Sequence, residues 1–159
     1  MAGIFATAGA HLYIGGSLAA KTTDFVVGDF AGQSWVNVGW MENIGAFGDE
    51  ASSITFDAIE QQRTQKLKGT RNAGDMTLVC GLDYEDAGQI ALRAAEAEPN
   101  NYAFKVEFND APVAGTPSER YFVALVMTAR EQLDGANNVM KLNATLGINS
   151  NIVRVNAAA

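Results

Sequence analysis

Apolar and polar residues alternate along much of this chain with the two-residue period of a β-strand. The clearest example spans 102–108, where Tyr102, Phe104, Val106 and Phe108 would face a core and the residues between them would face outward. Comparable patterns predict strands over 35–41, 75–82, 121–133, 140–148 and 152–155, and a short strand over 11–14. The chain is therefore predicted to be mainly β.

Two of these strands carry additional information. In the strand over 35–41, Val36, Val38 and Trp40 would share one face, and a tryptophan there is either a core residue or part of an interface. The strand over 121–133 begins apolar on both faces, so each face needs a cover. We expect the core on one face and either a helix or a neighbouring subunit on the other.

The segment 59–68 is polar on both faces and contains neither glycine nor proline, so propensity alone would allow a helix. We predict a strand instead, because the glycine-containing turn 69–74 would join it to the strand over 75–82 as a hairpin. A strand this polar cannot face a dry core on either side. It must therefore line solvent, a polar interface or a channel.

The only positive cluster of the chain lies in and just after this polar segment. It consists of Arg63, Lys66, Lys68 and Arg71. One interpretation is a solvated surface, where such charges contribute little to stability. The alternative is a subunit seam, in which the four residues form salt bridges with acidic groups of a neighbouring copy.

One helix is predicted, over about 84–97. Asp83 can cap its N-terminus, with Asp86 as a capping-box partner, and Pro99 follows its end. Residues at helical spacing would form a mostly alanine stripe against a sheet, leaving Gln89, Arg93 and Glu96 outside. The stripe comprises Ala87, Ile90, Ala91, Ala94 and Ala95.

The order of elements is strands, one helix, and strands again, without βαβ alternation. This order predicts a β-sandwich or small barrel with one flanking helix. The 159 residues fit a single domain, 1–159, with a weakly patterned N-terminal arm over about 1–34. Several strand edges would stay open, and pairing with copies of the same chain is one way to close them.

A long loop is predicted over 43–53, before a strand that starts with Ile54, Phe56 and Ala58. Loops of this length inside a compact domain are often functional. Asp49 and Glu50 form a carboxylate pair in it, but no further ligand stands at metal-binding spacing, so a solvated loop tip is the better interpretation.

The chemistry of catalysis and cofactor binding is missing from the sequence. A single histidine, His11, would have to serve any catalytic triad, and no phosphate-binding glycine motif, zinc-ligand pair or calcium loop is present. The one cysteine, Cys80, alternates with apolar residues and is predicted to be buried. The sequence therefore predicts no enzyme, no cofactor and no metal site.

Composition limits the possible partners and compartment. Hydrophobic residues make up 48% of the chain, enough for a core, and the formal net charge is −7. An acidic chain gains nothing from neutralising phosphates, which disfavours a specific nucleic-acid binder. No window approaches the roughly 20 apolar residues of a membrane helix, and the N-terminus does not resemble a signal peptide. We expect a cytoplasmic protein without a membrane partner.

The ordered set of segments between Trp35 and Val155 resembles a known family. A glycine-bearing loop precedes the strand start at 54–58, and a polar strand runs into Lys-Gly-Thr-Arg-Asn-Ala-Gly-Asp at 68–75. A strand, an acidic-started helix over 83–98 and the Tyr-x-Phe-x-Val strand at 102–106 follow, before a final long hairpin. In this order the chain is similar to the tail tube (major tail) proteins of long, flexible-tailed bacteriophages and of gene transfer agents.

This resemblance implies a structural virion protein that assembles with itself into hexameric rings. The rings would stack into a tube that conducts double-stranded DNA without binding it, and an acidic lumen would repel the phosphates. The resemblance also implies a relation in fold to type VI secretion tubes, tape-measure and tail-terminator partners, and a place in the virion tail after synthesis in the host bacterial cytoplasm.

Within the resemblance, the predicted loop over about 44–53 contacts the adjacent ring. Its candidate inter-ring residues are Ile44, Phe47, Asp49 and Glu50. An alternative from a different class is a monomeric β-sandwich module that binds a ligand or carbohydrate. Such a module would report its ligand through the fluorescence of Trp35 or Trp40.

Overall fold

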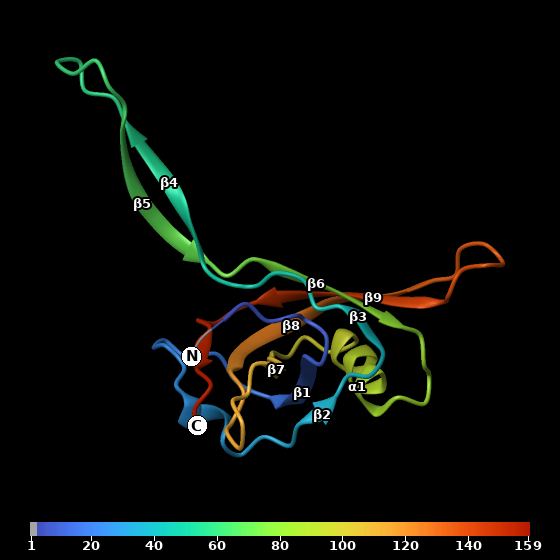
Figure 1. Cartoon of the computed structure of the whole chain (residues 1–159). Helices are drawn as coiled ribbons and strands as arrows, with labels where there is room; N and C mark the ends of the chain where they lie inside the picture. Colours follow the sequence, from blue (N-terminus) through green and yellow to red (C-terminus); the bar gives the residue numbers. More distant parts are fainter. Residues whose placement is uncertain (1–2) are drawn as a thin grey trace.

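The computed structural model describes residues 3–159 as a β-rich body with one helix and one long projecting hairpin (Figure 1). The strands are β1 His11–Ser17, β2 Val36–Asn37, β3 Met41–Asn43, β4 Glu50–Phe56, β5 Gln65–Asn72, β6 Asp75–Gly81, β7 Tyr102–Glu107, β8 Glu119–Gln132, β9 Lys141–Ile148 and β10 Val153–Val155. A short 3₁₀ helix, η1, spans Val27–Phe30, and the α-helix α1 spans Ala87–Glu96. The prediction of a mainly β, sandwich-like fold with one helix is confirmed.

The main sheet runs in the order β2-β1-β7-β8-β9-β6-β3, with β10 beside β8. All of its recorded strand pairs are antiparallel. Its two ends, β2 and β3, do not pair with each other in the described residues, so this sheet does not close into a barrel. The second sheet contains only β4 and β5.

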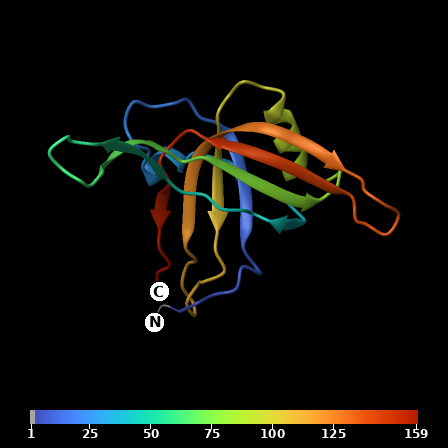
Figure 2. The ribbon, with the colours of Figure 1, turned by 90° about the horizontal axis from the view of Figure 1, so that it is seen from above.

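The long strand β8 belongs to both layers of the body. Residues 119–124 pair with β7, whereas residues 124–132 pair with β9. A register irregularity between Val126 and Thr128 lies in the second part, and such bulges bend a strand. Figure 2 shows the result, because β6 and β9 cross over β1 and β7. The core lies between these two layers.

The main core is built from the alternating residues predicted above. Phe104 and Phe122 are fully buried and stack with their ring centroids 5.7 Å apart. β9 alternates strictly, burying Leu142, Ala144, Leu146 and Ile148. These strands were predicted correctly because their large apolar residues alternate along the chain and so share the face that packs in the main core.

The outer face of β7 and β8 is covered by the N-terminal third of the chain. Phe25 and Phe30 are buried against Val123 and Ala103 in a second, smaller cluster. The predicted helix is therefore not what covers this part of the face, whereas Met127, further along the same face of β8, is 54% exposed. Within the segment 1–34, expected to be a weakly patterned arm, Phe25 and Phe30 supply this cover and residues 11–17 form strand β1 of the main sheet.

The predicted hairpin between 59–68 and 75–82 is wrong. β5 pairs with β4, whereas β6 pairs with β9 and β3. The glycine-containing turn instead carries the chain from one sheet to the other, with Gly74 at a φ of 74° that favours glycine. β6 reaches the core because Met76, Leu78 and Cys80 are apolar on one face, which the polar strand β5 cannot match.

The predicted strand over 35–41 is interrupted at Trp40. This residue has a φ of 57°, so the chain turns between β2 and β3. Val38 is buried, but the Trp40 side chain is 71% exposed and does not share its face. The turn is fixed by the backbone N–H of Gly39, which donates to the Asp86 carboxylate at 3.1 Å.

The helix is present, but its cap and its buried face differ from the prediction. Asp86 rather than Asp83 is the N-cap, accepting a hydrogen bond from the backbone N–H of Gln89. Gln89 is fully buried, whereas Ile90 is 51% exposed. The buried set is Gly88, Gln89, Leu92 and Ala95.

Gln89 is buried because its side-chain amide has three backbone partners. It donates to the carbonyls of Gly39 and Gly81 and accepts from the backbone N–H of Asp83. A buried amide is tolerated when it is satisfied in this way. Gly88 allows the close approach, because a Cβ there would lie 2.2 Å from the carbonyl oxygen of Asn37.

Cys80 is buried in β6, as predicted, and burial raises the pKa of its thiol to about 11. We expect less than one modified thiol in ten after an hour with a thiol reagent at pH 8, because the thiolate is the reacting form. The thiol should react completely in denaturant. Mass spectrometry of the labelled protein checks this, and rapid labelling of the native protein would contradict it.

Candidate assembly surfaces

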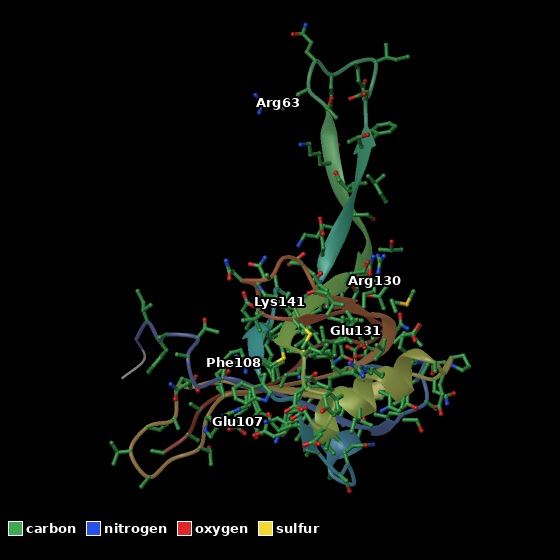
Figure 3. All side chains as sticks on the ribbon, turned by 90° about the vertical axis from the view of Figure 1, so that its right-hand side faces the viewer. Arg63, Glu107, Phe108, Arg130, Glu131 and Lys141 are labelled. Carbon is green, nitrogen blue, oxygen red and sulfur yellow. The ribbon has the colours of Figure 1, made fainter. Side chains whose placement is uncertain are left out.

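The β4–β5 hairpin is the most distinctive feature of the surface. Its strands pair with each other from Glu50↔Asn72 to Phe56↔Gln65, and with no other strand of the described residues. It extends far from the body, and the label of Arg63 marks its distal end (Figures 1 and 3). A two-stranded hairpin is at best marginally stable by itself in water. Another surface is therefore needed to hold it.

The two faces of this hairpin differ in character. Ile54 pairs with Leu67, and Phe56 lies on the same face two residues further along. These three side chains are 51%, 61% and 59% exposed, respectively. We call them the hairpin patch. Sequence reasoning missed this patch, although the alternation of Ile54 and Phe56 with polar residues was visible.

The opposite face of the hairpin is basic. Lys66 pairs with Thr55 and Lys68 pairs with Ser53, so both lysines share this face. Arg63 lies in the loop between the strands, and Arg71 lies near the root of the hairpin. The structure thus gathers all four predicted seam residues on one hairpin. All four are exposed, and none forms an ion pair with another of residues 3–159.

The four predicted inter-ring residues divide into two groups. Ile44 and Phe47 are half-buried against the main core, and the Phe47 ring stacks on Phe122 with centroids 5.9 Å apart. Asp49 lies just before the hairpin, and Glu50 is the first residue of β4. The region predicted as one loop over 43–53 is therefore a core-packed connection followed by a strand.

Gly45 shows why this connection lies so close to the body. Its φ is 80°, and a Cβ there would lie 2.4 Å from the carbonyl oxygen of Thr77 in β6. Only glycine fits such a conformation at such a distance. A deletion of 45–52 would remove these contacts together with Phe47. A substitution or deletion that tests the projecting hairpin without disturbing the core must therefore lie within the hairpin itself.

A second exposed group of apolar side chains lies beside α1 and the far end of β8 and β9. Trp40, Tyr84, Val139 and Met140 are between 52% and 75% exposed. We call them the Trp40 patch. Backbone hydrogen bonds from Gly81 to Trp40 and from Leu82 to Met140 hold its parts together.

The charged groups of the body make structural contacts. Lys105 lies 3.7 Å from the Glu119 carboxylate and over the ring of Tyr13, at 4.5 Å from its centroid. Arg93 of α1 pairs with Glu131 at 3.0 Å, which ties the helix to β8. Residues 3–159 contain no group of three or more His, Cys, Asp or Glu that could hold a metal ion. In the same range, no helix has the length and apolarity to span a membrane.

Asp110 provides a pH-dependent contact. The hydroxyl and the backbone N–H of Ser118 donate to its carboxylate at 2.6 and 2.7 Å, and these bonds hold the pKa of Asp110 below its usual value. The contact therefore stabilises the fold above the unfolded pKa, about 3.9, and is lost as the pH falls through the lower folded value.

We expect Asp110→Asn to lower the melting temperature by a few degrees at pH 7. The difference from the wild type should shrink as the pH falls below about 4, because the wild type then loses the same charge. Thermal unfolding between pH 2.5 and 7 measures this, with Asp57→Asn at the exposed hairpin tip as the control. A difference that stays constant with pH would contradict the assignment.

The chain matches a known protein family along most of its length. The family model described as "Phage tail tube protein, TTP" matches residues 9–157. No curated protein sequence matches the chain significantly.

Solved structures share the fold at low identity. A chain of the anti-feeding prophage baseplate, described as 6-fold symmetrised, has a TM-score of 0.71 and 11% identity over 98% of both chains. A chain of the sheath/tube terminator of an extracellular contractile injection system has a TM-score of 0.66 and 10% identity, over 97% of this chain and 98% of that one. The SPP1 tail tube has a TM-score of 0.59 and 15% identity, over 92% of this chain and 77% of that one.

Proposed function

This chain belongs to the phage tail tube protein family, and we propose that its copies join into hexameric rings that stack into the tube of a virion tail. The observation that carries the proposal is the β4–β5 hairpin, whose apolar and basic faces have no partner in the described residues. Exposed apolar surface on a projecting element is typical of a protein interface. The role is structural rather than enzymatic.

Open strand edges support lateral joining of copies. β3 ends the main sheet, and residues 125–132 of β8 have no described strand partner on the side that carries β7. An open edge presents unpaired backbone groups that another strand can bind. Edge pairing between neighbours would join the sheets of successive copies into a ring. The 6-fold symmetrised baseplate, which has a similar fold, is consistent with six copies.

We assign two kinds of contact between copies, the subunit seam and the inter-ring contact, to the β4–β5 hairpin and the connection before it. We assign the subunit seam to Arg63, Lys66, Lys68 and Arg71, which are exposed and unpaired within residues 3–159. In the inter-ring set, Asp49 and Glu50 would contact the neighbour directly. Ile44 and Phe47 would hold the base of the segment, because they pack against the core.

The proposed content of the tube is double-stranded DNA that passes without specific binding. The net charge of −7 makes a tube of many copies strongly acidic, and such a tube repels phosphates. Further proposed partners are a tape-measure protein and a tail terminator. The fold is shared with a sheath/tube terminator, which is consistent with a terminator that continues the tube. Synthesis would take place in the host bacterial cytoplasm.

Negative-stain electron microscopy of the purified protein tests this function. We expect rings or tubes with a central opening, and sedimentation of the same sample should show species far larger than 16.8 kDa. Low and high salt should both be examined, because charge contacts weaken with ionic strength. A protein that stays monomeric at high concentration in all conditions would contradict the proposal and favour a monomeric binding module.

A further inference from the structure

The two exposed apolar patches lie at opposite ends of the molecule. The hairpin patch (Ile54, Phe56 and Leu67) extends from one side of the body, and the Trp40 patch lies at the other side, beside α1 and the β8–β9 end (Figures 1 and 2). One chain therefore cannot cover its own Trp40 patch with its own hairpin. Two complementary surfaces at opposite ends are the arrangement of a head-to-tail contact between copies.

The Trp40 patch is held rigidly in an exposed position. Trp40 has a left-handed φ of 57°, which is unfavourable for a bulky side chain. Its indole N–H donates to the Asp83 carboxylate at 3.1 Å, and the Gln89 amide binds the carbonyl of Gly39 beside it. Backbone strain that the surroundings enforce in this way is found at functional sites. Here the result is a large aromatic ring presented to solvent.

The surface around Trp40 is hollowed and acidic. A hollow of about 540 Å³ is lined by Trp40 and Val139 together with Asp134 and with Glu42, which pairs with Lys141 of the same hollow at 2.9 Å. Asp83 lies beside this hollow, because its carboxylate accepts a hydrogen bond from the Trp40 indole N–H. The same carboxylate accepts a hydrogen bond from the backbone N–H of Glu85, which therefore lies close by. Apolar walls with acidic groups around them fit an occupant that has both exposed apolar side chains and basic side chains.

The hairpin has that composition. Residues 50–72 contain four of the 11 basic residues of the chain and only three of its 18 acidic residues, so the rest of the chain has 7 basic and 15 acidic residues. Lys66 and Lys68 are separated in the chain only by Leu67 but stand on the face opposite the hairpin patch, so a hairpin that enters the hollow presents apolar side chains on one side and lysines on the other. The charges of the hairpin and of the body are therefore complementary.

The other apolar hollow of the body is a poorer match. It is smaller, about 270 Å³, and is lined by Phe5, Phe47 and Phe108 among others. Its one acidic residue is Asp110, whereas Glu42 and Asp134 line the hollow at Trp40 and Asp83 accepts a hydrogen bond from the Trp40 indole. It therefore offers the lysines of β5 fewer acidic groups.

We propose that the β4–β5 hairpin of each copy docks on the Trp40 patch of the next copy. The hairpin patch packs on Trp40, Tyr84 and Val139, and the lysines of β5 pair with Glu85 and Asp134. Each copy thus donates one hairpin and accepts one. This docking identifies the surfaces that meet in the assembly proposed above, and it rests on that proposal.

Charge reversal on either side of the contact tests this docking. The donor variant is Lys66→Glu/Lys68→Glu, and the acceptor variant is Glu85→Lys/Asp134→Lys, all at exposed positions. Alone, each variant places like charges across the contact and should remain at least tenfold less assembled than the wild type in sedimentation velocity. Mixed in equal amounts, they should assemble, because each hairpin then meets an acceptor of opposite charge.

The outcomes distinguish a failure of the proposed docking from a failure of the proposed tube function. Arg154→Glu, at an exposed position on β10, is the control and should assemble like the wild type. If the wild type assembles but the mixture does not, or if either variant assembles alone, the docking is wrong and the tube function stands. A wild type that never assembles contradicts both.

Fluorescence of Trp40 gives a second measurement that does not depend on charge. The chain has two tryptophans, so Trp35→Phe leaves Trp40 as the reporter. Its emission should shift to shorter wavelength on assembly, since docking removes the ring from water. Unchanged emission in fully assembled protein would overturn the proposal.

Discussion

Replacing residues 54–67 by Asn-Gly is expected to give a folded monomer that no longer assembles. Ser53 and Lys68 are paired in the hairpin, so a two-residue type I′ turn can join them. The change removes the hairpin patch and two of the four basic residues, Arg63 and Lys66, but none of the main core residues. Assembled material should fall by at least tenfold in sedimentation velocity.

The control for this shortened chain keeps the hairpin and changes only its polar face. Thr55→Ala should assemble as the wild type does, because Thr55 lies opposite Lys66, away from the hairpin patch. The circular dichroism spectrum and the melting temperature of the shortened chain should be close to those of the wild-type protein. A shortened chain that still forms rings or tubes would show that strand edges alone hold the assembly.

The largest loss of stability is expected for Phe122→Ala. Phe122 is fully buried in β8, and its ring stacks between Phe47 and Phe104 at 5.9 and 5.7 Å. Removing a phenylalanine ring from a packed core costs about 3–5 kcal/mol, since the lost contacts leave a cavity. Because typical domains have only about 5–15 kcal/mol of stability, this variant should be close to unfolding at 37 °C.

Urea unfolding followed by circular dichroism measures this loss. Met127→Ala is the matched control on the same strand, because Met127 is 54% exposed. It should change the free energy of unfolding by less than about 1 kcal/mol. Equal losses for the two variants would mean that Phe122 is not at the centre of the core.

The strands with one dry face could be predicted from the sequence, and those without one could not. β7 and β9 were located within a residue or two, because their alternating apolar residues point into the main core. β4 was expected to be a loop over most of 50–53. Its first residues are small and polar, and both of its faces are exposed, so burial left no pattern there.

The face of α1 was misassigned for a different reason. A helix rich in alanine has a weak apolar direction, so local spacing does not fix its rotation. Its rotation is set by partners distant in sequence, namely the carbonyls of Gly39 and Gly81 that bind Gln89. Gly88 is a further constraint, because it allows the backbone of Asn37 to approach.

Some residues of the proposed assembly surface could be identified in the sequence as a cluster. The basic residues Arg63, Lys66, Lys68 and Arg71 were identified as a cluster, and the structure places them on one hairpin. The pairing of that hairpin was not predictable, because the polar strand could combine with either neighbouring segment. The Trp40 patch was not identified because alternation placed Trp40 on one face with Val36 and Val38, whereas its own left-handed backbone conformation turns it outward.

The isolation of the β4–β5 hairpin has a consequence for the timing of assembly. Its backbone hydrogen bonds join two exposed strands that do not pack on the core. They should therefore open at a small cost in free energy in the free chain. Amide hydrogen exchange of 50–72 would then be fast in monomers and slow in assembled protein.

A hairpin that becomes fully ordered only on contact makes the first contact between free copies slow, and growth on an existing ring faster. Tubes would accordingly appear after a lag that preformed rings abolish.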